Sequence, residues 1–201
     1  MIGLAPFLLG VLQGHLGSVQ GALRAADVRT ADAVVYLVPL NSSELPPPAE
    51  HQLIDQRDLR FAPRVLILPP GSTVDFLNSD PLLHNVFSPA SPGPGFNLGV
   101  YPLTERRSHV FLEEGAHVVL CHIHPEMLAY VIVLPVRLRT TVDSEGRFLL
   151  DSVPPGHYQL RVWHRRLTFP GQQIEVAPDA RLHLDLFLSP RRRDRKERAP
   201  L

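Results

Sequence analysis

The sequence predicts an all-β protein, and three observations carry that prediction. Proline accounts for 21 of the 201 residues, and a proline inside a helix removes a hydrogen-bond donor and clashes with the preceding turn. Apolar and polar residues alternate over short runs along most of the chain, which is the period of a half-buried strand. Clusters of Pro, Gly, Asn and Ser separate the runs, as is typical of antiparallel β-sandwiches.

The expected strands are short and follow one another in order, with turn residues between most of them. The strand-like runs are 17–23, 33–38, 65–68, 73–77, 108–112, 117–120, 130–134, 146–150, 157–162, 173–176 and 181–188. The turn clusters are 46–48, 69–71, 78–81, 91–95, 143–146 and 154–156.

The two ends of the chain differ from this pattern. Residues 2–12 are almost wholly apolar, so we expect residues 1–15 to be a secretory signal peptide and the protein to be periplasmic or extracellular. No Lys or Arg precedes Arg24 and no clean small-x-small cleavage site follows, so an apolar first strand is the alternative. We expect residues 189–201 to form a disordered basic tail, with docking on an acidic partner or a membrane as the disfavoured alternative.

Charge and cysteine content exclude several classes of function. Twenty basic and twenty acidic side chains balance, so bulk charge gives no reason to expect nucleic acid as a partner. A single cysteine excludes an internal disulfide, a zinc site with two or four cysteines, an iron–sulfur cluster and a two-cysteine copper centre. With no Ser-His-Asp order and no Gly-rich phosphate loop, we expect neither an enzyme nor a small-molecule substrate.

The chemistry is concentrated around the single cysteine. Cys121, His124 and Met127 form a Cys-x-x-His-x-x-Met segment, and His84 lies upstream after a strand-like run. A thiolate, two imidazoles and a thioether are the donor set of a mononuclear type 1 copper site. The thiolate is a soft, covalent donor, the imidazoles tolerate both Cu(I) and Cu(II), and a distant methionine sulfur is a weak axial donor. We therefore expect one copper ion at these four residues.

Two other interpretations of these residues stay open. The cysteine could be a small buried hydrophobe without a metal. Zinc could bind His84, Cys121 and His124, with or without His122, but this leaves Met127 unexplained.

Two neighbours of the candidate ligands receive other expectations. Strand alternation places His122 on the face opposite Cys121, so we expect a packed or surface histidine rather than a fifth ligand. Glu126 lies one residue from the methionine position, and we expect it to face solvent.

These motifs resemble the cupredoxin family. The resemblance rests on residues 61–63, 71–80 and 84–86 and on the loop that begins at Cys121, and it covers about residues 53–134. The spacing Cys-x-x-His-Pro-x-Met is similar to that of amicyanin and of cupredoxin-like proteins linked with methylamine utilisation. The resemblance implies an eight-stranded Greek-key sandwich with one type 1 copper ion and a one-electron role. Because about eighty residues is short for this fold, an early strand would be missing or supplied by the N-terminal segment.

The resemblance also assigns roles to individual positions. His84, Cys121 and His124 would be the equatorial ligands, and Met127 would be the axial ligand. Asn85 would join the two ligand loops by a hydrogen bond, the kind of support that metal ligands need.

A second resemblance lies outside this segment. Residues 141–162 are similar to the carboxypeptidase regulatory-like domain, a small transthyretin-like β-sandwich with a T-D-x-x-G-x-F motif, a Pro-x-Gly turn and a Y-x-L-x-V strand. The two strands with which that family begins match residues 17–21 and 32–37. Asp32 replaces the glycine of the second motif.

The position of the two resemblances predicts a split domain. Residues 16–40 and 136–188 would form one regulatory-like sandwich, with the cupredoxin segment 53–134 inserted between its second and third strands. The alternative is a tandem arrangement in which residues 17–39 are the first cupredoxin strands.

Together these observations predict an exported copper protein that transfers single electrons to or from a redox protein partner. A copper carrier without redox cycling and a metal-free envelope interaction module are the alternatives. We expect Trp163 and His164 to be packing residues rather than part of the copper site.

Overall fold

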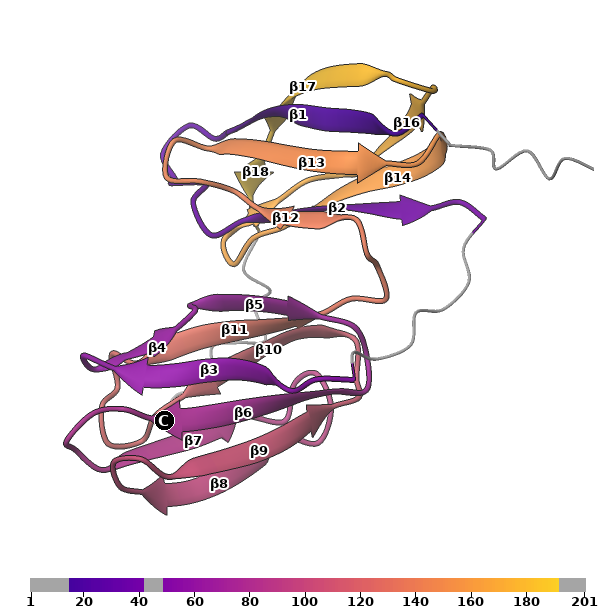
Figure 1. Ribbon diagram of the computed structural model, residues 1–201. Coiled ribbons are helices and arrows are strands. Elements are labelled where there is room, and N and C mark those ends of the chain that lie inside the picture. Colours follow the sequence, from indigo (N-terminus) through magenta and orange to yellow (C-terminus); the bar gives the residue numbers. More distant parts are fainter. Residues whose placement is uncertain (1–14, 42–48, 192–201) are drawn as a thin grey trace, which may run out of the picture. The chain divides into compact units, whose positions relative to one another are not determined.

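The computed structural model describes residues 15–41 and 49–191, and this part of the chain is built from strands. It contains 18 strands and no helix, which confirms the all-β fold class (Figure 1). Among these residues no helical segment has the length and apolar character needed to cross a membrane. The predicted signal peptide, apart from its last residue, and the tail from residue 192 onward lie outside the described residues.

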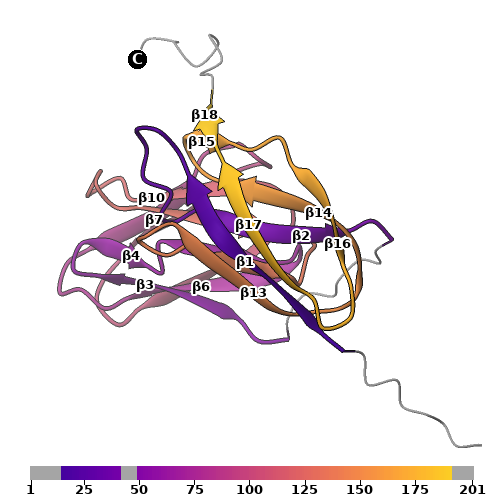
Figure 2. The same cartoon turned by 90° about the horizontal axis from the view of Figure 1, so that it is seen from above.

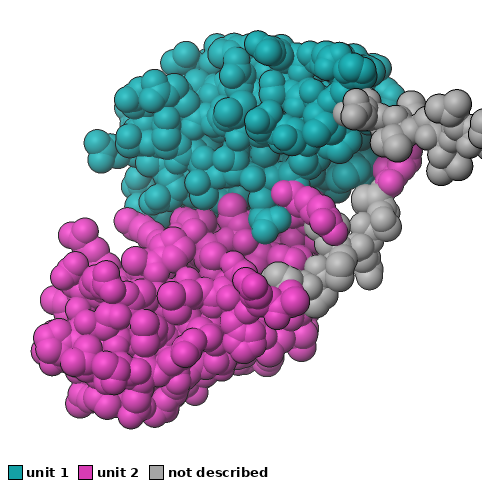
Figure 3. All heavy atoms as spheres, viewed as in Figure 1, with its two compact units in different colours: residues 1–40, 138–201 teal, residues 41–137 magenta. Residues whose placement is uncertain are grey.

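The chain divides into two compact units, coloured separately in Figure 3. Unit 1 comprises Met1–Leu40 together with Leu138–Leu201, and unit 2 is the continuous segment Asn41–Arg137 between them.

Unit 1 contains a three-stranded and a four-stranded sheet around one apolar core, and a short two-stranded pair. The three-stranded sheet has the order β13 (Arg147–Val153), β1 (Gly17–Arg24), β17 (Arg181–Phe187). The four-stranded sheet has the order β12 (Arg139–Thr141), β2 (Val34–Pro39), β14 (Gly156–Trp163), β16 (Gln172–Val176). The two-stranded pair is β15 (Leu167–Thr168) with β18 (Ser189–Pro190).

Strand pairing in unit 1 joins the segment before unit 2 to the segment after it. β1 runs antiparallel to β13 and parallel to β17, and Figures 1 and 2 both show β17 alongside β1. β2 pairs with β14, with Leu37 opposite Leu160. A sandwich with another unit inserted into it requires such pairing between strands that precede and strands that follow the insertion. We therefore keep the split-domain arrangement as our interpretation.

The expected boundary of the basic tail is two residues too early. Residues Ser189–Pro190 form β18 instead of beginning a disordered segment. Backbone hydrogen bonds hold this region, because the Leu188 N–H donates to the Arg24 carbonyl and the Arg191 N–H donates to the Arg166 carbonyl.

Unit 2 is a pair of sheets around a second apolar core. The five-stranded sheet has the order β5 (Val65–Leu68), β11 (Leu128–Val133), β10 (Gly115–Leu120), β7 (His84–Ser88), β8 (Phe96–Tyr101). The four-stranded sheet has the order β4 (Arg60–Ala62), β3 (Gln52–Arg57), β6 (Ser72–Asn78), β9 (Arg106–Phe111). These are nine strands, one more than the resemblance implied.

The expectation of a missing or borrowed early strand is not met. β3 lies within unit 2 and pairs in parallel with β6, with Ile54 opposite Phe76, so the segment itself supplies its first strand. Among the described residues, every partner strand in the two sheets of unit 2 comes from unit 2 itself.

The topology of unit 2 brings the candidate ligands to one end of its five-stranded sheet. β7 begins at His84, β10 ends at Leu120 just before Cys121, and β11 begins at Leu128 just after Met127. Leu120 pairs with Phe87 of β7 and with Leu128 of β11, so these three strand ends are neighbours.

Candidate metal centre

Three potential metal donors come together at this end of unit 2. One ligand atom each of His84, Cys121 and His124 lies within 4.8 Å of the others. Within the described ranges this is the one cluster of three or more His, Cys, Asp and Glu side chains close enough to hold an ion. His84 and Cys121 are buried and His124 is half-buried, so the cluster reaches from the core toward the surface.

The short loop between β10 and β11 carries Cys121 and His124 of this cluster, and also Met127. Cys121 and Met127, at its two ends, are buried in the apolar core of unit 2. Between them the chain turns, and the Met127 N–H donates a hydrogen bond to the His124 carbonyl at 3.0 Å. The turn places the His124 ring beside the imidazole of His84, which comes from the start of β7.

The two imidazoles have the geometry of ligands that share an ion. Their Nδ1 atoms are 3.1 Å apart, and the ring planes are inclined at 64°. Two nitrogens that each lie about 2.0 Å from one ion at a tetrahedral angle are about 3.3 Å apart. The Nδ1 atoms of His84 and His124 therefore fit a single metal ion, and the buried thiol beside them supplies the soft donor that copper favours.

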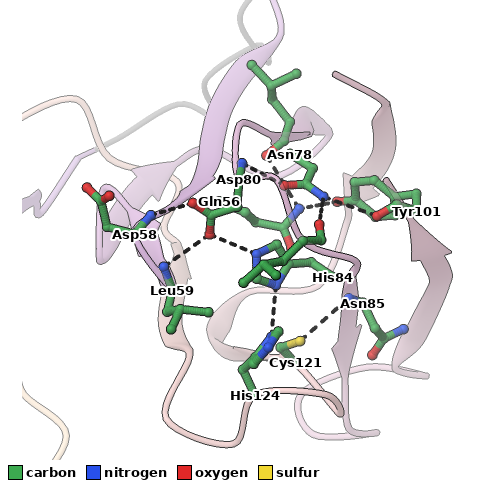
Figure 4. A network of polar contacts seen from close by, with 12 residues as sticks. Gln56, Asp58, Leu59, Asn78, Asp80, His84, Asn85, Tyr101, Cys121 and His124 are labelled. Atoms are coloured by element: carbon green, nitrogen blue, oxygen red, sulfur yellow. Dashed lines mark hydrogen bonds and ion pairs between the residues drawn. The ribbon is translucent and has the colours of Figure 1, made fainter. Parts of the chain in front are cut away.

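The other ring nitrogen of His84, Nε2, contacts the buried carboxylate of Asp80 (Figure 4). His84 Nε2 lies 2.8 Å from Asp80 Oδ2, and both side chains are buried. Backbone N–H groups of Asp58 and Leu59 donate to the same carboxylate at 2.7 and 3.0 Å. Burial by itself raises the pKa of Asp80, but the hydrogen bonds from Leu59, His84 and Asp58 outweigh it and hold that pKa below its ordinary value.

Asn85 links the two segments that carry the donors. Its backbone N–H donates to Cys121 Sγ at 3.5 Å, and its Oδ1 accepts the backbone N–H of His122 at 3.4 Å. Its Nδ2 donates to Asn97 Oδ1 and to the Gly99 carbonyl, both on β8. This is the position at which the resemblance placed a hydrogen bond between the ligand loops.

The remaining candidates occupy different environments. Met127 is fully buried in the same core cluster as Cys121. His122 is exposed, and its ring packs on Phe87 with the ring centroids 3.7 Å apart. Glu126 is exposed.

Asp80 contacts a candidate ligand directly, and it was not among the site residues predicted from the sequence. It precedes His84 by four residues and follows Asn78, whose Oδ1 accepts the Asp80 N–H at 2.9 Å. The sequence contains this Asn-x-Asp-x-x-x-His spacing, but it does not show that residues 58–59 approach from another hairpin.

Comparisons at the sequence level found no relative: no family model matches the chain, and no curated protein matches it. Comparisons of structure found partial matches. One is a purple cupredoxin from Nitrosopumilus maritimus, at 29% identity over 41% of this chain and 99% of that chain, with a TM-score of 0.37.

Two further solved structures match part of the chain. Amicyanin from Paracoccus versutus is 20% identical over 49% of this chain and 98% of that chain, with a TM-score of 0.40. The copper-containing nitrite reductase from Thermus scotoductus is 22% identical over 56% of this chain, with a TM-score of 0.41. This chain spans 28% of that reductase.

Proposed function

We propose that unit 2 binds one copper ion and serves in one-electron transfer. The observation that carries this proposal is the buried thiol of Cys121 within 4.8 Å of nitrogens from His84 and His124. Met127, buried at the end of the same loop, would be the axial donor. The resemblance of residues 53–134 to cupredoxins supports the same ligand set.

The chain provides what such a centre needs. Copper, when bound, supplies a one-electron couple between Cu(I) and Cu(II). Cys121 would bind as the thiolate, with its proton released to solvent, and the Asn85 N–H that points at the sulfur would stabilise that negative charge. Because the donors stand at the ends of paired strands, little of the protein has to move when the electron arrives or leaves.

His124 would be the side of the centre closest to a partner. It is half-buried, whereas His84 and Cys121 are buried. Leu82, Leu83 and Ile123, which flank the donors in the sequence, are exposed. We propose that a redox protein docks here, and that the chain works in the periplasm or outside the cell.

Copper titration of the full chain tests the proposal. Cu(II) should produce an intense visible thiolate-to-copper charge-transfer band that disappears in Cys121→Ser and weakens strongly in His124→Gln. His122→Gln is the matched control, because it alters an exposed histidine of the same loop and should leave the band in place.

Three results would contradict the proposal. A colourless protein that takes up no copper would favour the metal-free interaction module. A site that binds zinc and stays colourless with copper would favour the zinc interpretation. Bound copper that cannot be reduced and reoxidised reversibly would favour a carrier.

We also propose that unit 1 is a carboxypeptidase regulatory-like sandwich that unit 2 interrupts. The proposal is supported by the two sequence motifs and by the pairing of β2 with β14 across the interruption. Removal of unit 2, described in the Discussion, tests it.

A further inference from the structure

We propose that Asp80 is a positioning residue of the metal centre, which turns the Nδ1 lone pair of His84 toward the ion and lowers the reduction potential of bound copper. The inference rests on the proposed function, because it concerns the same site.

The hydrogen bond from His84 to Asp80 fixes how the imidazole carries its proton. A carboxylate only accepts hydrogen bonds, so the 2.8 Å contact places the proton of a neutral His84 on Nε2. The lone pair then lies on Nδ1, which is the atom 3.1 Å from His124 Nδ1. Asp80 therefore presents the correct nitrogen to the ion before any metal binds.

A tight turn holds Asp80 in place. Asp58 and Leu59 form the two-residue connection between β3 and β4, with Arg57 paired to Arg60 on either side. Both turn residues are in the left-handed region, at φ +55° and +56°. That conformation is unfavourable for a leucine and persists only where the surroundings support it.

The Asp80 carboxylate in turn stabilises this conformation of Asp58 and Leu59. The N–H groups of the two successive turn residues converge on Asp80, one on each oxygen. Figure 4 shows the resulting chain of contacts, from the turn through Asp80 to His84 and on to His124. The shape of a hairpin outside the ligand loop is thereby linked to the orientation of a ligand.

The buried charge of Asp80 has a second effect. A negative charge beside a ligand stabilises Cu(II) more than Cu(I), because the oxidised ion carries the larger positive charge. A hydrogen bond to a carboxylate also makes the imidazole a stronger donor. Both effects lower the potential, and removal of the charge should raise it.

The test uses the copper-loaded full chain and the variant Asp80→Asn. Asparagine is nearly the same size and can accept a turn N–H, but it carries no charge. We expect the visible band to remain and the midpoint potential to rise by about 59 mV or more, a tenfold change in the ratio of oxidised to reduced copper at fixed potential. Asp80→Glu, which restores the charge, should recover part of the shift.

Asp75→Asn is the matched control. Asp75 is another buried carboxylate of unit 2, and its partners are His51, Arg106 and Ser108 rather than a candidate ligand. Its removal should shift the potential much less than removal of Asp80. Equal shifts in the two variants, or an unchanged potential in Asp80→Asn, would overturn the inference.

A measurement on the metal-free protein keeps the test decisive if Asp80→Asn does not fold. Nitrogen NMR of wild-type His84 should show the proton on Nε2. A proton on Nδ1 would overturn the inference, whatever copper does. Failure of the wild-type chain to bind copper would instead contradict the proposed function and would leave the tautomer result to decide the role of Asp80.

Discussion

His84 and His164 are both buried, but their hydrogen bonds give the two rings different chemistry. His84 faces a carboxylate through Nε2. His164 accepts backbone N–H groups of Arg166 and Leu167 through Nδ1, which fixes its ring as a neutral acceptor. Burial, followed by the positive charges of Arg165 and Arg166, lowers the pKa of His164 to about 4. His164 is thus a structural residue, in keeping with its predicted packing role.

This lowered pKa makes the stability of unit 1 depend on pH. In the unfolded chain His164 is protonated below its ordinary pKa of about 6.5, whereas in the folded chain it stays neutral down to about pH 4. The free energy of unfolding should therefore fall as pH drops through this window, by about 2 kcal/mol between pH 7 and pH 4.5.

The variant His164→Asn isolates the effect, because an asparagine Oδ1 can accept the same N–H groups without titrating. Urea unfolding at the two pH values, followed by fluorescence, provides the measurement. Trp163 is the only tryptophan of the chain and lies on β14, so its emission reports on unit 1. An equal acid loss in wild type and His164→Asn would exclude His164 as the cause.

At the scale of single residues, the candidate donors are visible in the sequence, whereas the residues that hold them in place are not. Cys121, His124 and Met127 share one short loop, so their spacing is visible in the sequence. Asp80 is held by a turn more than twenty residues upstream, at Asp58 and Leu59. That contact depends on how two hairpins meet, and nothing local in the sequence encodes it.

At the scale of elements, β1 is a central strand whose backbone lies very close to a neighbouring strand. It lies between β13 and β17, and Gly21 sits where the backbone of β17 comes close. A Cβ added at Gly21 would lie 1.8 Å from the Leu184 carbonyl oxygen, which is far inside van der Waals contact. The glycine is required because backbone atoms cannot move aside as a side chain could.

Gly21→Ala should lower the free energy of unfolding of unit 1 by about 2–4 kcal/mol, since the pairing of β1 with β17 must open to admit the methyl group. Trp163 fluorescence during urea unfolding measures the loss. Gly156→Ala on β14 is the control, because its Cβ would meet only the Tyr158 ring, at 3.5 Å or more. If both variants are equally stable, the close approach of β1 and β17 is not what limits the sheet.

Strands β3, β7 and β8 were not predicted as strands from the sequence, each for a local reason. β7 is buried on both faces along most of its length, so apolar and polar residues do not alternate in it. β8 contains Gly99 at positive φ, and in β3 one of the two buried positions is the polar Gln56. β5 is itself a run of four apolar residues, and its predicted bounds, 65–68, agree with the structure. Alternation thus identifies strands with one buried and one exposed face, and an unbroken apolar run such as β5 is the other strand pattern that stays visible in the sequence.

At the scale of the whole molecule, the two segments of unit 1 meet at the junctions with unit 2. The Leu37 N–H donates to the Leu138 carbonyl at 2.9 Å, so the chain leaves and re-enters unit 1 at neighbouring points. A loop with adjacent ends accepts a deletion as readily as an insertion.

Replacement of residues 41–136 by a short Gly-Ser linker should therefore leave a folded unit 1. We expect cooperative unfolding by Trp163 fluorescence, β-type circular dichroism and no copper binding. A protein that is unfolded in buffer would show that unit 1 depends on unit 2 and would contradict its interpretation as a separate sandwich.

The pairing of β1 with β17 also has a consequence for the order in which the protein matures during synthesis. Unit 2 is complete once residue 137 has been made, and its sheets recruit no strand from unit 1 within the described residues. β1 and β2 are made first, yet their partners β13, β14 and β17 emerge last. We therefore expect unit 2 to fold before unit 1, because the first strands of unit 1 can pair only after the last ones have emerged.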